Sequence, residues 1–395
     1  MTIDQTLKRP SKIFSIDLIC EIMALNFTAR LDNQPFLLHM TKNNNIKVLV
    51  AMSGGVDSSV AAGLLKKQGY QVSGVFMHFW VEKNLSGCTV LENKCCGEEA
   101  EQDVRAVAMK LNIPFYIFHF EKEFKKSIVD YFLKENSRGD TPNPCVRCNQ
   151  YIKFGLLLKK AQALGFDYVA TGHYLKKVNG KLFTARDTNK DQSYFLYTAT
   201  PQSLKHFLFP LGRYKKEKVR QIAKKMGLST FAKPESFDLC FVGDSHTEFL
   251  QRHLNPKKGD IVDEQGKILG VHNGLALYTV GQRKDIKLSG GPYYVLGFNF
   301  KKNHLVVTNN VKDKNLFKSE MLVKNVNWIS VCPQLPLRVK IKIRYRHKSV
   351  SATISRKISS GKYLINFNRG QRAITPGQSA VFYNKKEVLG GGIIN

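Results

Sequence analysis

Three cysteines stand in sequence contexts that suit sulfur chemistry. Cys145 and Cys148 form a C-x-x-C pair in the stretch T-P-N-P-C-V-R-C-N, and Cys240 lies further along in S-F-D-L-C-F-V-G. Thiols that can meet, one of them held as a thiolate by nearby cations, can pass a sulfur atom between them. Arg147, next to Cys148, and the positive charge of the whole chain favour a thiolate here. Taken alone, Cys240 between two apolar neighbours is interpreted more simply as a small buried apolar residue.

The cysteine content indicates a reducing compartment. Eight cysteines in 395 residues are too few for a disulfide scaffold, and the sequence shows no secretory signal, so we expect a cytoplasmic protein. No apolar run reaches transmembrane length, and we therefore expect no membrane partner. Cys88, Cys95 and Cys96 also cluster, but no histidine pair with zinc-site spacing follows them, so ordinary thiols are the simpler interpretation.

The stretch S-G-G-V-D-S-S, from Ser53 to Ser59, carries the second group of chemistry-bearing residues. It follows the apolar run 48–50, which predicts a buried strand, and precedes apolar residues at helical spacing. A strand, a glycine turn and a helix in this order present backbone N–H groups and a helix dipole that bind phosphate. An ordinary turn capped by Asp57 or Ser58 is the simpler alternative, but two glycines and three serines in seven residues argue against it.

The same stretch lacks the nucleotide P-loop pattern G-x-x-x-x-G-K-[ST] and its lysine. It resembles instead the PP-loop of ATP pyrophosphatases, enzymes that cleave ATP to AMP and pyrophosphate and adenylate a substrate. In that resemblance Gly54 and Gly55 let the backbone approach the phosphates, and Asp57 helps hold Mg²⁺. Hydroxyl groups that donate hydrogen bonds to the phosphates come from Ser53, Ser58 and Ser59.

The elements that position these residues alternate between strand and helix from Ile46 onward. Such alternation predicts a doubly wound parallel sheet that binds ligands outside the carboxyl ends of its strands. A loop rich in Gly, Pro and Asn, residues 137–149, interrupts the pattern and carries the C-x-x-C pair. We predict strands at 71–80, 114–120 and 167–171, helices at 98–111, 123–134, 154–164 and 215–226, and a hairpin turn at 178–181.

The last third of the chain changes to short strands broken by Gly, Asn and Pro, which predicts a small antiparallel barrel. In the clearest strand, 339–346, apolar residues alternate with Lys340, Lys342, Arg344 and Arg346. The whole chain has 61 Lys and Arg against 31 Asp and Glu, a net charge of +30 that favours a polyanion. An anionic membrane surface or a generally basic proteome accounts for the net charge equally well. A strand face with four cations and no acid predicts contact with RNA phosphates.

Further motifs, found in order along the chain, resemble those of the tRNA-specific 2-thiouridylases. Besides A-M-S-G-G-V-D-S-S and the two cysteine segments, they are A-T-G-H-Y at 170–174, K-D-Q at 190–192, T-P-G-Q-S-A-V-F-Y at 375–383 and L-G-G-G-I-I at 389–394. The resemblance extends from about Ile46 to the C-terminus. It implies ATP-dependent 2-thiolation of the wobble uridine of tRNA, in which adenylation turns the 2-oxygen into a leaving group.

The resemblance also implies the domain organisation. We expect a PP-loop catalytic domain of the adenine nucleotide alpha hydrolase type at 46–243, a small central domain at 244–288 and a C-terminal β-barrel that binds tRNA at 289–395. Residues 1–45 show no motif and precede the first strand. We expect them to form an N-terminal extension that is disordered or not translated.

Individual residues acquire roles from the resemblance. Cys240 receives a persulfide sulfur from a donor protein, and Cys148 releases that sulfur by forming a transient disulfide with Cys240. The implied ATP-binding residues are Ala51, Met52, Ser53, Gly54, Gly55, Val56, Asp57, Ser58, Met77 and Gly172. The implied contacts with tRNA are Asn143, Pro144 and Cys145 at the target base, and His173, Lys190, Asp191, Gln192, Arg344, Tyr345 and Gln378 elsewhere.

Cys145 departs from the family pattern, which has an aspartate at this position, so the expected acid–base carboxylate is missing. Cys145, Cys148 and Cys240 together supply three thiolates, which suit a [4Fe–4S] cluster with one open iron. The persulfide relay and the cluster mechanism use the same cysteines, and the sequence does not separate them.

Two further functions remain as alternatives. Another PP-loop ligase that adenylates a small molecule would share the phosphate turn, but it would need neither the cysteines nor the cationic strand. A tRNA-binding protein without catalysis would use the barrel alone and would form no AMP.

Overall fold

The computed structural model describes residues 43–82, 97–234, 239–243 and 245–395. Nearly all of the predicted N-terminal extension lies outside these residues, as do Cys88, Cys95, Cys96 and residues 236–238 of the Cys240 segment. Within the described residues, no helix combines the length and the apolar character needed to cross a bilayer.

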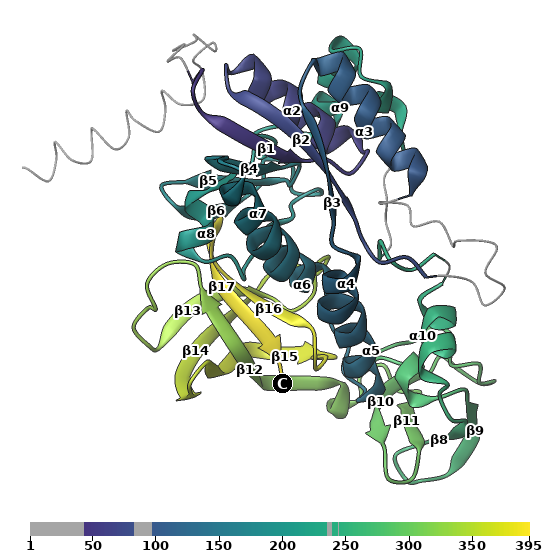
Figure 1. The fold of residues 1–395 in the computed structure, drawn as a ribbon. Helices are drawn as coiled ribbons and strands as arrows, with labels where there is room; N and C mark the ends of the chain where they lie inside the picture. Colours follow the sequence, from purple (N-terminus) through teal and green to yellow (C-terminus); the bar gives the residue numbers. More distant parts are fainter. Residues whose placement is uncertain (1–42, 83–96, 235–238, 244) are drawn as a thin grey trace, which may run out of the picture. The chain divides into compact units, whose positions relative to one another are not determined.

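Five parallel strands form the first sheet, in the order β3-β2-β1-β4-β7 (Figure 1). Leu49 in the central strand pairs with Ser73 on one side and Val169 on the other. The apolar run that predicted β1 is buried because parallel strands of this kind are covered on both faces. The predicted doubly wound architecture is confirmed, with strands β1 (Lys47–Ala51), β2 (Gln71–His78), β3 (Phe115–His119), β4 (Tyr168–Thr171) and β7 (Phe207–Leu208).

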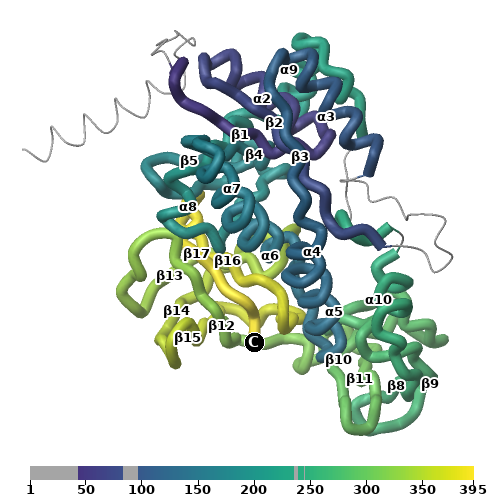
Figure 2. Tube along the Cα trace, in the orientation of Figure 1, coloured from purple at the N-terminus to yellow at the C-terminus, as the bar shows by residue number. Residues whose placement is uncertain are grey.

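Helices follow most strands of this sheet and pack against them, as the chain trace in Figure 2 shows. The helix after the phosphate turn begins at Val56, directly after Gly55, and the next helix ends at Asn112 in the left-handed conformation that favours Asn or Gly. These helices are α2 (Val56–Lys67), α3 (Glu98–Leu111), α4 (Glu121–Phe124), α5 (Asp130–Ser137), α8 (Pro201–Lys205), α9 (Lys216–Lys225) and α10 (His246–Leu254); between α4 and α5 the chain stays helical as the π-helical segment η1 (Lys125–Val129).

The helix that carries the C-x-x-C pair begins earlier than predicted. Its first segment, α6 (Pro144–Arg147), runs on into the π-helical segment η2 (Cys148–Leu157) and α7 (Leu158–Ala163). The side chain of Asn143 caps the first turn by accepting from the Val146 N–H at 3.3 Å, and Pro144 occupies the first helical position. An asparagine followed by proline is a helix start signal, so the predicted loop ends at Asn143 and not at residue 149.

Four strands form a second sheet in the order β10-β11-β8-β9. Residues 294–308 were expected in the C-terminal barrel, which was predicted to begin at residue 289. They pair instead with the preceding strands, since Leu305 lies opposite Ile261 and both are buried in one apolar cluster. The strands are β8 (Gly259–Val262), β9 (Ile268–His272), β10 (Tyr294–Asn299) and β11 (His304–Thr308).

The C-terminal strands close into the predicted antiparallel barrel. The sheet order is β12-β15-β14-β13-β16-β17, and β12 also pairs with β17, which closes the ring. Alternate side chains such as Val339 and Ile341 point into its core. The strands are β12 (Phe317–Trp328), β13 (Leu337–Lys342), β14 (Val350–Ser359), β15 (Lys362–Arg372), β16 (Ser379–Asn384) and β17 (Glu387–Ile394).

A hairpin from the middle third of the chain extends this sheet. The predicted turn at 178–181 joins β5 (Leu175–Val178) and β6 (Lys181–Thr184), and Val388 of β17 pairs with Leu182 of β6. The segment that follows the A-T-G-H-Y motif therefore joins the parallel-sheet region to the barrel through main-chain hydrogen bonds.

Candidate active site

A cavity of about 350 Å³ opens at the carboxyl ends of β1, β2 and β4. Doubly wound sheets bind ligands at this edge, as the sequence predicted. The cavity brings the phosphate turn together with all three cysteines of the sulfur motifs. Its lining residues are Ala51, Met52, Ser53, Asp57, Ser58, Met77, Phe79, Phe124, Ile128, Pro144, Cys145, Cys148, Asn149, Lys153, Thr171, Gly172, His173, Gln192, Phe195, Leu239, Cys240 and Phe241.

The phosphate turn is held in shape by its own serines. The Ser53 N–H donates to Ser58 Oγ at 3.2 Å, and the Ser58 hydroxyl donates to the Gly55 carbonyl at 3.1 Å. The Ser59 hydroxyl donates to the same carbonyl at 2.9 Å. Ser58 and Ser59 were expected to donate to phosphate, but both hydroxyls are engaged inside the loop. Backbone N–H groups at the start of α2 and the exposed Ser53 remain as the donors for an anion.

Two glycines let the backbone segments of this turn approach closely. Gly54 has φ of +71°, and a Cβ there would lie 2.8 Å from the carbonyl oxygen of Ala100. A Cβ on Gly172 would lie 2.8 Å from the amide nitrogen of Ser58. Gly172 therefore packs directly against the first turn of α2, next to the predicted nucleotide site.

Asp57, which was expected to help hold Mg²⁺, forms an ion pair in this structure. Lys216 Nζ lies 2.8 Å from Oδ1 and 2.7 Å from Oδ2 of Asp57, and the Tyr174 hydroxyl donates to Oδ1 at 2.7 Å. Lys216 is only 7% exposed, and its backbone N–H donates to Asp187 Oδ2 at 2.9 Å. Both oxygens of Asp57 are thus satisfied by protein donors.

Sequence reasoning missed Lys216 although a signal was present. Lys216, Val219 and Ala223 are all buried and recur at helical spacing on one face of α9. A lysine on the apolar face of a helix needs a buried anionic partner. The pattern therefore indicated a buried ion pair, but it could not indicate which acid forms it.

The sulfur end of the cavity is built from two segments that are far apart in the sequence. Cys145 is exposed on α6, and Cys148 begins η2 in a half-buried position. Cys240 is also half-buried, and its neighbour Phe241 anchors it. The Phe241 ring packs edge to face against Phe124 at 5.9 Å, and its other edge-to-face partners are Phe132 and Phe249.

Arg147 does not take the position that its sequence neighbourhood indicated. Its guanidinium lies over the rings of Tyr131, at 4.0 Å, and Tyr151, at 4.4 Å, and is absent from the cavity lining. The lysine that does line the cavity is Lys153, five residues after Cys148 on the same π-helical segment.

His173, expected to contact tRNA, lies on the cavity wall. Its Nδ1 is 2.8 Å from Thr171 Oγ1 and its Nε2 is 3.4 Å from Lys153 Nζ. Burial and then the charge of Lys153 hold the pKa of His173 well below its usual value of 6.5. The imidazole is therefore neutral near pH 7, with Nε2 accepting from Lys153 and Nδ1–H directed at Thr171.

The K-D-Q motif, expected to contact tRNA, has its three side chains in different surroundings. Asp191 is 4% exposed; it accepts from the Ala185 N–H at 3.0 Å and the Ser193 hydroxyl at 2.8 Å, and it lies 3.7 Å from Lys342 Nζ. Gln192 lines the cavity and accepts the Tyr174 N–H at 2.9 Å, and Lys190 is partly exposed beside them. Asp191 therefore supports the loop, because its carboxylate is already satisfied.

The remaining predicted tRNA contacts lie outside the cavity lining. Arg344 donates to Ala373 O and to Thr375 Oγ1 at 2.8 Å. The Tyr345 ring packs on the cavity residue Phe195 at 4.4 Å, and Gln378 Nε2 donates to the Thr141 carbonyl at 2.8 Å. Arg344 and Lys342 thus have partners inside the protein. The sequence predicted that all four cations of 339–346 lie on one face of a strand that contacts RNA phosphates. The strand β13 ends at Lys342, so Arg344 and Arg346 lie beyond it.

Whether the cavity can hold a metal ion or a [4Fe–4S] cluster depends on which ligand side chains lie close together. Cys145, Cys148 and Cys240 line one cavity, but among the described residues no three Cys, His, Asp or Glu side chains gather closely enough to hold a metal ion. The residues as placed do not fit a [4Fe–4S] cluster.

Comparison with known proteins covers nearly the whole chain. Residues 46–244 match the tRNA methyl transferase HUP domain, 247–309 the tRNA methyl transferase PRC-barrel domain and 318–394 the aminomethyltransferase beta-barrel domain. The tRNA-specific 2-thiouridylase MnmA of Clostridioides difficile is 45% identical over 89% of this chain and 98% of its own length. MnmA 2 of Caldanaerobacter subterraneus is 46% identical over 90% of this chain and 99% of its own length.

Solved structures are more distant. A 4-thiouridine synthetase–RNA complex with bound ATP has 17% identity and a TM-score of 0.31 over 52% of this chain and 49% of that chain. The sequence relatives decide the assignment, since they match all three folded regions at once. The chain belongs to the tRNA-specific 2-thiouridylase family.

Proposed function

We propose that this protein is an ATP-dependent tRNA sulfurtransferase that replaces the 2-oxygen of the wobble uridine with sulfur. The observation that carries the proposal is the single cavity that contains both the phosphate turn and the three cysteines. A PP-loop enzyme that adenylates a small molecule needs the first group but not the second. The relatives named as tRNA-specific 2-thiouridylases support the same substrate and reaction.

The phosphate turn binds ATP in this proposal. The N–H groups at the start of α2 and the Ser53 hydroxyl contact the phosphates, while Met77 and Gly172 lie against the nucleoside. The uracil 2-oxygen attacks the α-phosphorus, the bond to the β-phosphate breaks, and pyrophosphate leaves with the electron pair. The proton on N3 of the base passes to water, and an AMP ester at the 2-position results.

The cysteines then replace that ester with sulfur. The terminal sulfur of a Cys240 persulfide attacks the activated carbon, and AMP leaves with the electron pair of its bond to that carbon. The Cys148 thiolate attacks Cys240 Sγ, so the Cys148–Cys240 disulfide forms and the outer sulfur stays on the base. N3 takes a proton back from water, which gives the thiocarbonyl form. The two cysteine thiols are oxidised as the persulfide sulfur is reduced, and a thiol reductant then restores them.

Partners follow from the same chemistry. A persulfide donor protein must load Cys240, and tRNA must place its base at Asn143, Pro144 and Cys145, which begin α6. Exposed cations such as Lys340 and Arg346 supply charge for tRNA phosphates. We place this reaction in the cytoplasm, where tRNA and thiol reductants are both present.

Metal ions enter the proposal in a limited way. Mg²⁺, when bound with ATP, would neutralise charge on the departing pyrophosphate. Because Asp57 already accepts from Lys216 and Tyr174, we assign it no step through Mg²⁺. We likewise route no step through a [4Fe–4S] cluster.

The test is thiolation of tRNA in vitro with ATP and a persulfide donor, measured by nucleoside mass spectrometry together with AMP formation. Cys240→Ser and Cys148→Ser should each lose at least 10³-fold in thiolation, on the scale of nucleophile removal. Cys332→Ser, at an exposed position of the barrel region, is the matched control and should keep the wild-type rate. The proposal fails if both site variants thiolate normally or if no tRNA-dependent AMP appears.

The same assay rejects the alternatives by different outcomes. AMP formation with a small acceptor and without tRNA would favour another PP-loop ligase. Binding of tRNA with no AMP at all would indicate a non-catalytic protein. Iron and acid-labile sulfide in anaerobically purified active protein, lost in the Cys145→Ser variant, would favour the cluster.

A further inference from the structure

The charged side chains around the cavity differ in whether they have a partner of opposite charge. Asp57 is paired with Lys216, and His173 is neutral, as described above. Lys153 has its polar contact with the imidazole of His173 at 3.4 Å, and among the described residues no carboxylate pairs with it. In the part of the chain that the structure describes, the cavity therefore holds one lysine whose positive charge no neighbouring acid balances. ATP brings several negative charges to such a site.

Lys153 also lies between the two ends of the cavity. It follows Cys148 by five residues in η2, and π-helical geometry puts residues at this spacing on nearly the same face. Its partner His173 is adjacent to Gly172, which packs on the first turn of α2. The contact with His173 and the packing of Gly172 thus connect Lys153 to the phosphate turn, and η2 connects it to Cys148.

We propose that Lys153 is a catalytic residue of the adenylation step, whose ammonium group contacts the α-phosphate during its transfer to the uracil 2-oxygen. The inference rests on the proposed function, because it assumes ATP and uridine as substrates. As the bond from the 2-oxygen to phosphorus forms and the α–β bond breaks, negative charge spreads over the transferring group. A lysine fixed there stabilises that charge more than it stabilises the bound substrates.

The phosphate turn contains no lysine, so a lysine that contacts the phosphates must come from another part of the chain. A P-loop carries its own phosphate-binding lysine within the turn, and S-G-G-V-D-S-S has none. Lys216 is held by both oxygens of Asp57, so it is not the unmatched cation. Lys153 lies in η2, which lines the same cavity, and it supplies the positive charge that the phosphate turn lacks.

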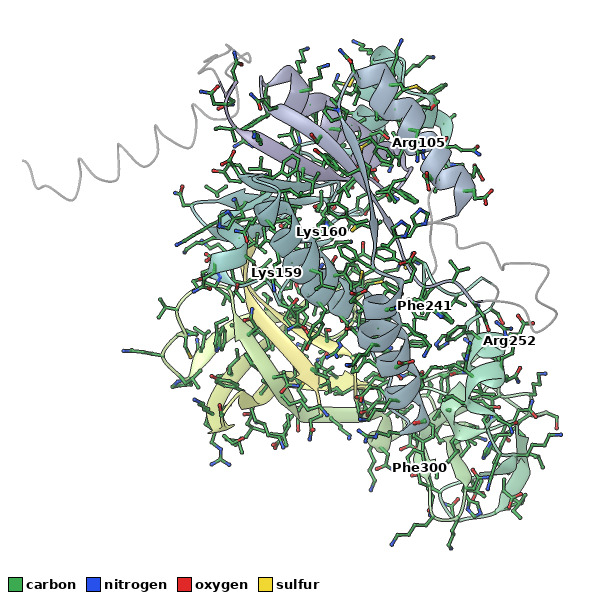
Figure 3. The ribbon with its side chains drawn as sticks, viewed as in Figure 1. Arg105, Lys159, Lys160, Phe241, Arg252 and Phe300 are labelled. Atoms are coloured by element: carbon green, nitrogen blue, oxygen red, sulfur yellow. The ribbon has the colours of Figure 1, made fainter. Side chains whose placement is uncertain are left out.

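The experiment compares Lys153→Met and Lys153→Arg with Lys159→Met in the full chain. Lys159 is exposed and lies on α7, continuous with η2, where Figure 3 labels it, so its variant is a matched control for helix content and net charge. The assay measures tRNA-dependent pyrophosphate release in single turnover. We expect a loss of about 10²–10³-fold for Lys153→Met, the scale of removing one transition-state donor. Partial activity should remain in Lys153→Arg and full activity in Lys159→Met.

A second readout separates a charge effect from a folding effect. The imidazole of His173, followed by NMR, should titrate at higher pH in Lys153→Met and be unchanged in Lys159→Met, because only the first removes the adjacent charge. Pyrophosphate release within threefold of wild type in Lys153→Met would overturn the inference while leaving the proposed function intact. Normal release with loss of thiolation alone would also overturn it. Absence of tRNA-dependent release in the wild type would overturn both.

Discussion

The two ends of the cavity are built in different ways. The phosphate end comes largely from one continuous stretch, whose serines bond to its own backbone and whose glycines admit neighbouring main chain at close range. The sulfur end comes from segments far apart in the sequence, and aromatic side chains around Phe241 hold them together. The first end is therefore stiff by local bonding, and the second depends on packing.

This difference predicts that the two ends can be damaged separately. A core substitution near Cys240 should harm sulfur transfer while ATP binding continues. A substitution among the polar groups that surround Asp57 should harm the phosphate end first.

The largest effect on stability is expected from Phe241→Ala. Phe241 is 2% exposed and contacts three other phenylalanine rings, so its removal leaves a cavity that costs about 3–5 kcal/mol of unfolding free energy. Urea unfolding measures this loss. ATP affinity, measured by calorimetry at a temperature where the variant is folded, should stay within threefold of wild type while thiolation falls.

Phe300→Ala is the control for the loss of an aromatic ring, because Phe300 is 52% exposed (Figure 3). It should cost less than about 1 kcal/mol. Equal losses of ATP affinity and thiolation in Phe241→Ala would show that the two ends do not behave as separate structures.

Lys216→Met should have the next largest effect, at the phosphate end. It leaves Asp57 without its ion-pair partner, which costs about 2–3 kcal/mol because Asp57 keeps some contact with solvent. The exposed Lys218→Met on the same helix should be near neutral. Chemical unfolding of both single variants and of the double variant with Asp57→Asn measures the coupling, and a coupling energy near zero would contradict the ion pair.

The same contrast explains how much the sequence could predict. The order of strands and helices, the closed barrel and the phosphate turn are encoded locally, by apolar periodicity and by glycines at fixed positions. Lys216 and Asp57 are distant in sequence. The apolar periodicity of a helix does not indicate which acid a buried lysine will pair with. The motif of Asp191 predicted a contact with tRNA, but it gave no sign that the carboxylate also accepts hydrogen bonds from Ala185 and Ser193.

Errors in element boundaries have a similar origin. The start of the cysteine helix at Pro144 had a local signal, the Asn143 cap, which was available but not used. The pairing of β10 and β11 with β8, and of β6 with β17, had no such signal. Register between distant strands depends on which apolar faces meet, and several alternatives satisfy the same alternating pattern.

His173, which lines the cavity, should make the stability of the protein depend on pH. Its folded pKa lies below the value of about 6.5 in the unfolded chain, so the unfolded chain binds a proton that the folded protein does not. Stability should therefore fall as pH drops below 6.5, by about 1.4 kcal/mol per pH unit from this residue. Urea unfolding between pH 5 and 8, at about half-unit steps, should show a smaller slope in His173→Gln than in wild type.

His347→Gln is the control for this slope, since His347 is exposed. Its profile should follow wild type. His246 and His272 have lowered pKa values too, so the quantity to compare is the difference between variants. Equal slopes for His173→Gln and wild type would mean that the imidazole is accessible to protons in the folded protein.

The smallest effect is expected from Ser59→Ala, which removes one of the two hydroxyls that bind the Gly55 carbonyl. A single neutral hydrogen bond of this kind contributes about 1 kcal/mol, and the Ser58 hydroxyl still satisfies the acceptor. Ser137→Ala, whose hydroxyl donates to Lys134 at an exposed helix end, should cost less and serves as the control. Because Ser59 acts within the loop and not on phosphate, ATP affinity should change less than threefold in Ser59→Ala. A loss of affinity tenfold or greater, measured by calorimetry at unchanged fold, would show that the Ser59 hydroxyl turns from Gly55 to the nucleotide when ATP binds.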